Sequence, residues 1–229
     1  MSRARTSLRL LAGVFAVSVA AACLQPAQAE AGVSAPASLV QSKEAKGLKT
    51  AVFAGGCFWG MEAVFSHMKG VSSVVSGFEG GSRSDAHYEI VSSGTTGHAE
   101  AVRITYDPAV VRYDQLLQVF FSVASDPTQL NRQYPDTGTQ YRNAIVPQNA
   151  EQARVTTAYL AQLKKSGLWK RPIVTAVEPN RGFFAAEDYH QDFALKNPDH
   201  GYIRMWDAPK VTALKRTFPG LWKPDFTRG

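Results

Sequence analysis

The chain has 229 residues, of which 45% are hydrophobic and 19% charged, so it can bury a sizeable core and lacks the composition of a disordered or fibrous protein. Its two cysteines exclude a disulfide-rich scaffold and any four-cysteine metal centre. The formal charge of +6 owes part of its excess to three arginines within the first nine residues, and without a run of Lys and Arg no nucleic-acid partner is predicted.

Residues 1–29 have the organisation of a secretory signal peptide. The three arginines are followed by an uncharged apolar run over residues 10–22, and Ala27-Gln28-Ala29 fits the small-x-small cleavage pattern. The run is too short to span a bilayer as a helix, which takes roughly 20 residues. The sequence therefore predicts export to the periplasm or the exterior, cleavage after Ala29 and no stable insertion into a membrane.

Cys23 leaves a second processing route open. It follows three alanines, which distantly resembles a lipoprotein signal, although the Leu that usually lies three positions before the Cys is missing. Processing as a lipoprotein would anchor the chain through an acylated Cys23. Cleavage after Ala29 would instead leave Cys57 as the single cysteine of the mature chain.

Composition divides the remainder into a leader and one domain. Residues 30–47 are rich in Ala, Ser, Gly and Pro, which predicts a flexible leader. From residue 48 the apolar content is that of a packed domain, and no long linker or internal repeat interrupts it. Residues 48–229 are therefore predicted to form a single domain.

Hydrophobic periodicity predicts alternating strands and helices in this domain. Expected strands cover residues 49–54, 71–78, 99–106, 141–146 and 172–178, and expected helices cover 57–68, 113–124, 149–165 and 185–195. Polar segments over 79–97 and 125–140 are expected loops, and the tail shows only weak periodicity. The core order β-α-β-β-α-β predicts an α+β two-layer sandwich with a ferredoxin-like, split β-α-β core.

A turn of two glycines, Gly55-Gly56, joins the first expected strand to a helix that opens at Cys57. Glycines permit a tight turn and the close approach of another molecule. A thiol at a helix N-terminus faces unpaired N–H groups and the positive end of the helix dipole, and both favour the nucleophilic thiolate. A lone cysteine is more often a buried structural residue, which remains the alternative. The aromatic neighbours Phe58 and Trp59 add to the case for a site.

Glu100 is the candidate acid. It precedes Val102, Ile104 and Tyr106 at even spacing, so its carboxyl group is expected on the buried face of the strand. Burial raises the pKa of a carboxyl group and can keep it protonated near neutral pH, as proton donation requires. An exposed Glu at the strand end, the alternative, would lie on the opposite face.

Five short motifs follow one another along the domain. They are GCFWG at residues 56–60, TGHAE at 96–100, DPTQLNRQ at 126–133, GTQYR at 138–142 and AEDYHQ at 186–191. Together they resemble the signatures of the A-type peptide methionine sulfoxide reductases, over about residues 48–205. The resemblance implies reduction of methionine sulfoxide, in its S epimer and either free or in proteins, to methionine, and a role in the repair of oxidised proteins.

The resemblance also implies roles for particular residues. Cys57 attacks the sulfoxide sulfur, and Glu100 protonates the sulfoxide oxygen. Tyr88 and Tyr141 donate hydrogen bonds to that oxygen, although from the residues alone each is expected to fill the core. Asp136 supports the site through hydrogen bonds, although from the residues alone it is expected to be a turn residue.

The remaining implied contacts concern binding. Phe58 and Trp59 form the pocket for the substrate methyl group, and Gly56 contributes only through the shape of its backbone. The pattern departs from the family in two places, because residues 206–229 lack the resolving cysteines that members often carry, and Tyr134-Pro135 replaces a smaller pair.

The missing resolving cysteine determines the expected second half of the cycle. An oxidised Cys57 would be a sulfenic acid without an internal partner, so an external thiol must reduce it. The resemblance implies a redoxin such as thioredoxin or glutaredoxin as this reductant, and the chain is expected to act as a monomer without a bound cofactor.

Two other functions remain open from the residues. The first is a cysteine hydrolase or amidotransferase that pairs Cys57 with His190 or another His. The second is an exported thiol or sulfoxide-binding module without turnover. His98 and Glu100 resemble the H-x-E of zinc deaminases, but the cysteine pair of that family is missing and the histidines show no ligand spacing, so no metal is predicted.

Overall fold

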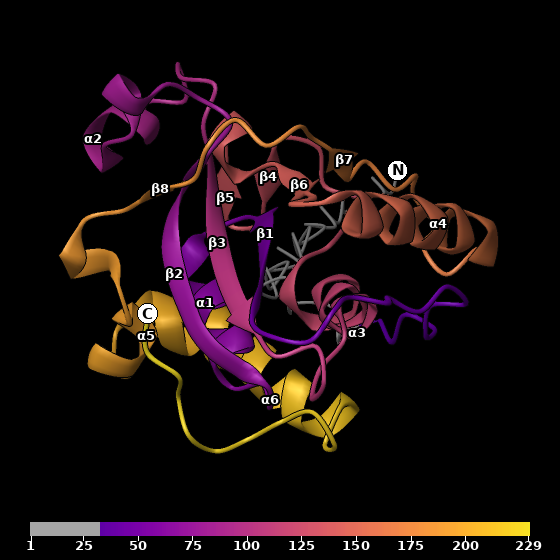
Figure 1. Cartoon of the computed structure of the whole chain (residues 1–229). Coiled ribbons are helices and arrows are strands. Elements are labelled where there is room, and N and C mark those ends of the chain that lie inside the picture. The colour runs from indigo at the N-terminus through magenta and orange to yellow at the C-terminus, as the bar shows by residue number, and fades with distance from the viewer. Residues whose placement is uncertain (1–32) are drawn as a thin grey trace, which may run out of the picture.

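The computed structural model describes residues 33–229, which are built around a six-stranded sheet in the order β7-β6-β1-β3-β2-β8 (Figure 1). The strands of this sheet are β1 (Lys49–Gly55), β2 (Val71–Glu79), β3 (Ala99–Tyr106), β6 (Asn143–Val146), β7 (Ala176–Val177) and β8 (Phe184–Ala185). Among the four central strands, β6-β1-β3-β2, each adjacent pair is antiparallel, whereas β7 runs parallel to β6. With α1 and α3 as the two crossover helices, this is the split β-α-β plan, so the predicted α+β sandwich is confirmed.

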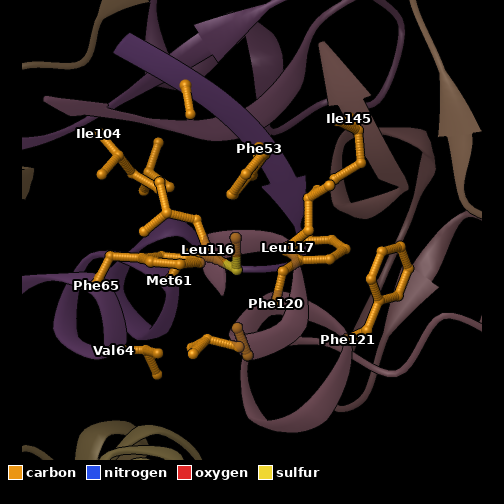
Figure 2. Close-up of a cluster of buried hydrophobic side chains, with 14 of the residues drawn as sticks. Phe53, Met61, Val64, Phe65, Ile104, Leu116, Leu117, Phe120, Phe121 and Ile145 are labelled. Carbon is orange, nitrogen blue, oxygen red and sulfur yellow. The ribbon is translucent and has the colours of Figure 1, made fainter. Parts of the chain in front are cut away.

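Helices cover one face of the sheet. They are α1 (Phe58–Ser66), α2 (Tyr88–Val91), α3 (Tyr113–Val119), α4 (Ala150–Ser166), α5 (Phe193–Lys196) and α6 (Ala208–Thr217). Phe53 of β1, Phe65 of α1 and Leu116 of α3 are fully buried in a shared cluster (Figure 2). Residues of α4 and α6 join the same cluster, so a single core stabilises the domain. No helix within residues 33–229 has the length and apolar character to cross a membrane.

Alternation along the strands separates the two faces of the sheet. In β3, Val102 and Ile104 point into the helix-covered core, whereas Ala99 and Ala101 belong to a smaller cluster on the opposite face. The small cluster is packed against Ala176 and Phe183, so both faces are dry at this end of the sheet. Buried strand ends of this kind can hold a polar group away from water.

Two elements in the middle of the chain differ from those predicted from the sequence. The helix predicted over 113–124 becomes α3 and a wider π turn over Phe120–Ala124, in which every residue is buried. The expected loop 125–140 contains a short hairpin, β4 (Arg132–Gln133) and β5 (Asp136–Thr137). Strands of two residues bury too little surface to leave a periodic signal in the sequence.

The helix predicted over 185–195 is wrong. The segment forms β8, a 3-10 turn over Asp188–His190 and the four-residue α5. The Gln191 side chain accepts from the backbone N–H of Ser76 at 2.9 Å and donates to its carbonyl oxygen at 2.9 Å, which fixes the segment to the outer edge of β2. The strand expected over 172–178 is likewise reduced to Ala176–Val177.

Residues 33–47 are ordered, which corrects the expected flexible leader for this part of the chain. The backbone N–H of Ser42 donates to Oδ1 of Asp114 in α3 at 2.9 Å, and the Tyr159 hydroxyl of α4 donates to the carbonyl oxygen of Pro36 at 2.6 Å. Helix side chains thus take the place of water for the extended backbone, a possibility that composition does not reveal. Residues 30–32 lie outside the described residues.

The tail forms a further helical layer instead of a weakly ordered end. A π turn over Ile203–Asp207 leads into α6, which begins with Pro209 in its first turn and buries Leu214. Helix α6 packs against α1, the helix that follows Cys57. The tail therefore contributes to the same end of the sheet as the cysteine turn.

Candidate active site

The cysteine turn lies where β1 ends and α1 begins. Cys57 is the N-cap of α1, with a φ of −50° and a ψ of 124°, so the helix starts one residue later than predicted. Its side chain is half-buried and reduced. Gly56 has a φ of +91°, the left-handed region that glycine adopts without strain.

Gly56 also has no room for a side chain, because a Cβ there would overlap the side chain of Gln133. We expect Gly56→Ala to lower the free energy of unfolding by about 1 to 3 kcal/mol and to reduce turnover, since both the φ value and the overlap must be relieved by moving the cysteine turn. Urea unfolding and a reductase assay measure the two effects. Gly167→Ala, at a helix end with a φ of +66° and open space, shares the strain without the overlap and should keep full activity.

The thiol is not a ready thiolate, which corrects the expectation from the helix terminus. Burial raises the pKa of the Cys57 thiol well above its ordinary value, and the nearby carboxyl groups of Glu100, Asp207 and Asp136 add to the rise. A hydrogen bond from the backbone N–H of Trp59 to the sulfur lowers the pKa but does not offset the burial. Without substrate, the Cys57 thiol therefore keeps its proton.

Glu100 lies on the buried face of β3, next to the cysteine turn. Its carboxyl oxygen Oε2 accepts a hydrogen bond from the backbone N–H of Phe58 at 3.0 Å. The pKa of Glu100 is raised to about 8, because burial and the nearby Asp136 and Asp207 outweigh the lowering effect of the hydrogen bond from the Phe58 N–H. Glu100 is therefore protonated at neutral pH and is held beside the residue that follows Cys57, as a proton donor must be.

Tyr88 and Tyr141 approach from two other segments. Tyr88 opens α2, where its backbone N–H donates to Oε1 of Glu187 at 3.0 Å, and Tyr141 ends a 3-10 turn after the β4-β5 hairpin. Burial, together with the nearby Glu100 and Cys57, raises the pKa of Tyr88 to about 12. Burial and the same two residues also raise the pKa of Tyr141. Both hydroxyls thus keep their protons and can donate to an oxygen placed near the thiol.

Asp136, expected in a flexible loop, lies in β5 and is fixed by a residue that the sequence did not suggest. The Tyr202 hydroxyl donates a hydrogen bond to Oδ2 of Asp136. Burial raises the pKa of Asp136, and this hydrogen bond lowers it. The ring of Tyr202 also meets Trp59 edge-on, with the ring centroids 5.9 Å apart. Tyr202 therefore links the loop, the tail and the aromatic residue beside the thiol.

Asp207 is a second site residue missed by sequence reasoning. Its side chain is fully buried, and Oδ1 lies 3.5 Å from Nζ of Lys210. Burial raises the pKa of Asp207 to about 6, although Lys210 lowers it. A Cβ at Gly60 would overlap Asp207, so the tail touches the first turn of α1 directly. A buried Asp in a tail of weak periodicity carries no pattern that could have identified it.

Phe58 and Trp59 occupy different positions beside the thiol. Phe58 is 1% exposed, and its ring packs on those of Tyr88 and His190. Trp59 is half-buried and stacks on Phe193 with the ring centroids 3.7 Å apart. The exposed part of Trp59 can therefore contact a ligand directly, whereas Phe58 is buried and packs against other residues of the site.

The histidines have structural partners. His190 accepts a hydrogen bond at Nδ1 from the indole N–H of Trp59 at 3.2 Å, and burial lowers the pKa of His190. That arrangement orients Trp59 and does not activate Cys57 as a hydrolase dyad would. His98 is held by the carbonyl oxygen of Ser82 at 2.8 Å and the N–H of Gly81 at 3.2 Å. Within residues 33–229 no group of three or more His, Cys, Asp or Glu side chains could hold a metal ion.

Comparisons with known proteins agree with this geometry. The family model for peptide methionine sulfoxide reductase matches residues 49–220. The peptide methionine sulfoxide reductase MsrA 2 of Mesorhizobium japonicum is 55% identical over 183 residues, which cover 80% of this chain and 94% of that protein. The MsrA 2 of Synechocystis is 48% identical over 177 residues, which cover 77% of this chain and 83% of that protein.

Solved structures show the same relationship. Reduced Mxr1 of Saccharomyces cerevisiae aligns with a TM-score of 0.59 and 30% identity over 72% of this chain and 94% of that one. Methionine sulfoxide reductase A of Corynebacterium diphtheriae aligns with a TM-score of 0.56 and 34% identity over 66% of this chain and 76% of that one.

The matched family and relatives are oxidoreductases, and this protein is an enzyme of that class. The chain belongs to the peptide methionine sulfoxide reductase family. Its reaction is the reduction of methionine sulfoxide.

Proposed function

We propose that the enzyme reduces the S epimer of methionine sulfoxide, free or in proteins, by direct attack of the Cys57 sulfur, and that it repairs oxidised proteins. The observation that carries the proposal is the hydrogen bond from the Phe58 N–H to Glu100, which supports Glu100 as the proton donor to the sulfoxide oxygen. Tyr88 and Tyr141 supply neutral donors for the same oxygen. Oxide is a poor leaving group, so attack at sulfur needs this protonation.

The proposed step balances without a cofactor. The Cys57 sulfur attacks the sulfoxide sulfur, Glu100 gives its proton to the oxygen, and the thiol proton restores the acid. The hydroxyl group then passes to the Cys57 sulfur as the sulfoxide S–O bond and the bond between the two sulfur atoms break. Cys57 is left as a sulfenic acid, and the substrate sulfur leaves as a thioether with two more electrons. A neutral thiol in the free site suits this order of events, because the proton leaves sulfur only when the sulfoxide accepts another.

An external thiol completes the proposed cycle. Residues 33–229 contain no cysteine besides Cys57, so the sulfenic acid has no partner there for an intramolecular disulfide. One thiol forms a mixed disulfide with Cys57 and releases water, and a second thiol releases the reduced enzyme. Thioredoxin, glutaredoxin or a similar redoxin is the proposed reductant, and the proposed functional unit is a monomer.

Export belongs to the same proposal. The expected signal peptide, its cleavage after Ala29 and the alternative anchor at Cys23 all lie outside the described residues. Their support is the order of charged, apolar and small residues in the sequence. An exported enzyme would require its redoxin in the same compartment.

The test is an assay with dithiothreitol and the separated S and R epimers of a methionine sulfoxide peptide. We expect the R epimer to react at least about 10²-fold more slowly, since inversion at sulfur exchanges the methyl group and the oxygen and misplaces both by more than an ångström. Equal rates for the two epimers would contradict the proposed assignment of donors and methyl pocket. More than one equivalent of product per enzyme in the absence of reductant would contradict the thiol cycle.

A further inference from the structure

Two large aromatic side chains meet at the edge of the site. Tyr134 follows β4, and Trp206 lies in the π turn before α6; their ring centroids are 5.0 Å apart and their planes 85° apart. Tyr134 is 47% exposed and Trp206 is half-buried. Contact with each other fixes the position of both rings, and part of their aromatic surface remains exposed to solvent.

The pair is continuous with the catalytic residues on both sides. Asp136, two residues after Tyr134, accepts the hydrogen bond of Tyr202, whose ring meets Trp59. Asp207, directly after Trp206, lies against the first turn of α1 beside Cys57. Tyr134 and Trp206 thus join the loop and the tail next to residues of the candidate active site.

The loop that carries Tyr134 is held independently of the ring. The backbone N–H of Tyr134 donates to Oε1 of Gln129 at 2.9 Å, and the amide of Gln129 donates to Oδ2 of Asp126 at 3.0 Å. Removal of the Tyr134 ring therefore leaves the backbone contacts of this loop in place. The exposed surface of the ring contributes neither to these contacts nor to the proton transfer at Cys57.

We propose that Tyr134 and Trp206 form a subsite for the polypeptide that flanks a methionine sulfoxide, and that they raise the preference for protein-bound over free sulfoxide. The inference rests on the proposed function, since a sulfoxide side chain that reaches Cys57 brings its own main chain next to the residues around the thiol. Rigid, half-exposed aromatic rings are the residues most enriched at the centres of polypeptide interfaces.

The experiment compares free methionine sulfoxide with a short peptide that carries the sulfoxide at its centre, with dithiothreitol as the reductant. Tyr134→Ala and Trp206→Ala should each lower kcat/KM for the peptide by about tenfold, the scale of one interface aromatic, and leave kcat/KM for the free sulfoxide within about twofold. Tyr134→Phe should keep the peptide rate. Leu168→Ala, an exposed apolar truncation in the turn after α4, is the matched control and should change neither rate.

Three results would overturn the inference. Equal losses on the free sulfoxide and the peptide would mean that the pair only supports the site, and unchanged rates on both would mean that it has no role. A loss that appears only when thioredoxin replaces dithiothreitol would assign the surface to the reductant. Failure of the proposed function is distinguishable, because it would appear in the wild-type enzyme as equal rates for the S and R epimers.

Discussion

Cys57→Ser is expected to lose methionine sulfoxide reduction by about 10⁶-fold, the scale reached when a covalent nucleophile is removed. The serine hydroxyl has a far higher pKa than a thiol, and the surroundings disfavour an anion even for sulfur, because burial and three carboxyl groups already raise the pKa of Cys57. A serine side chain also cannot form a sulfenic acid, because that product requires a sulfur atom. Methionine release in the presence of dithiothreitol measures the loss.

Cys23→Ser in the full chain is the matched control for this variant. Cys23 precedes the expected cleavage site after Ala29, so its removal should leave the rate unchanged. Thermal unfolding of the Cys57→Ser protein should remain within a few degrees of the wild type, since the substitution exchanges sulfur for oxygen at a half-buried position. Turnover by Cys57→Ser above a trace would remove Cys57 from the mechanism.

Glu100→Gln is expected to lower kcat/KM by roughly 10²- to 10⁴-fold, the contribution of one general acid. The amide can keep the hydrogen bond from the Phe58 N–H but cannot give a proton to the sulfoxide oxygen. With the pKa of Glu100 at about 8, wild-type kcat/KM should be level below that pH and fall about tenfold per pH unit above it. The variant should lack this fall. A rate within about threefold of the wild type would place the acid elsewhere.

The same substitution should change how stability depends on pH. The pKa of Glu100 is raised from 4.5 to about 8, so the folded chain keeps a proton that the unfolded chain loses within this window. The free energy of unfolding therefore falls as the pH rises from 4.5 to 8, and Glu100→Gln should remove this part of the slope. Urea unfolding across that range measures it.

Glu62→Gln is the matched control for the acid. Glu62 is a second fully buried carboxyl group, on α1, and burial raises its pKa to about 8 as well. Its replacement should also reduce the pH dependence of stability, whereas kcat/KM should still fall above pH 8 because Glu100 remains. If kcat/KM of the Glu62→Gln variant did not fall above pH 8, the assignment of the acid to Glu100 would be wrong.

Local sequence patterns were sufficient to predict the position of a residue where that position depends on a single helix, strand or turn. Even spacing with Val102 and Ile104 predicts the buried face of β3 for Glu100, and the structure places it there. The strand, two glycines and helix predict the cysteine turn, and Gly56 has the expected positive φ. The strand order followed from the alternation of elements, because the split β-α-β plan allows few connections between them.

Patterns failed where contacts distant in sequence decide the outcome. Tyr202 and Asp207 reach the site from a tail of weak periodicity, since they are fixed by Asp136 and by the close approach to Gly60. The helix terminus predicts a lowered pKa for Cys57, but the pKa is raised, because burial and carboxyl groups on other elements outweigh the hydrogen bond from the Trp59 N–H. Neither effect is visible in the residues around Cys57.

The central claim is that one cysteine carries the complete oxidation step. The direct measurement is the intact mass, with dimedone trapping, of a protein that begins at Glu30, taken after one equivalent of methionine sulfoxide and without reductant. The account predicts one molecule of methionine per enzyme, a chain heavier by about 16 Da before dimedone is added, and Cys57 as the site of the dimedone adduct afterwards. Stoichiometric methionine release with no oxidised cysteine, or with the oxygen on a residue other than Cys57, would contradict it.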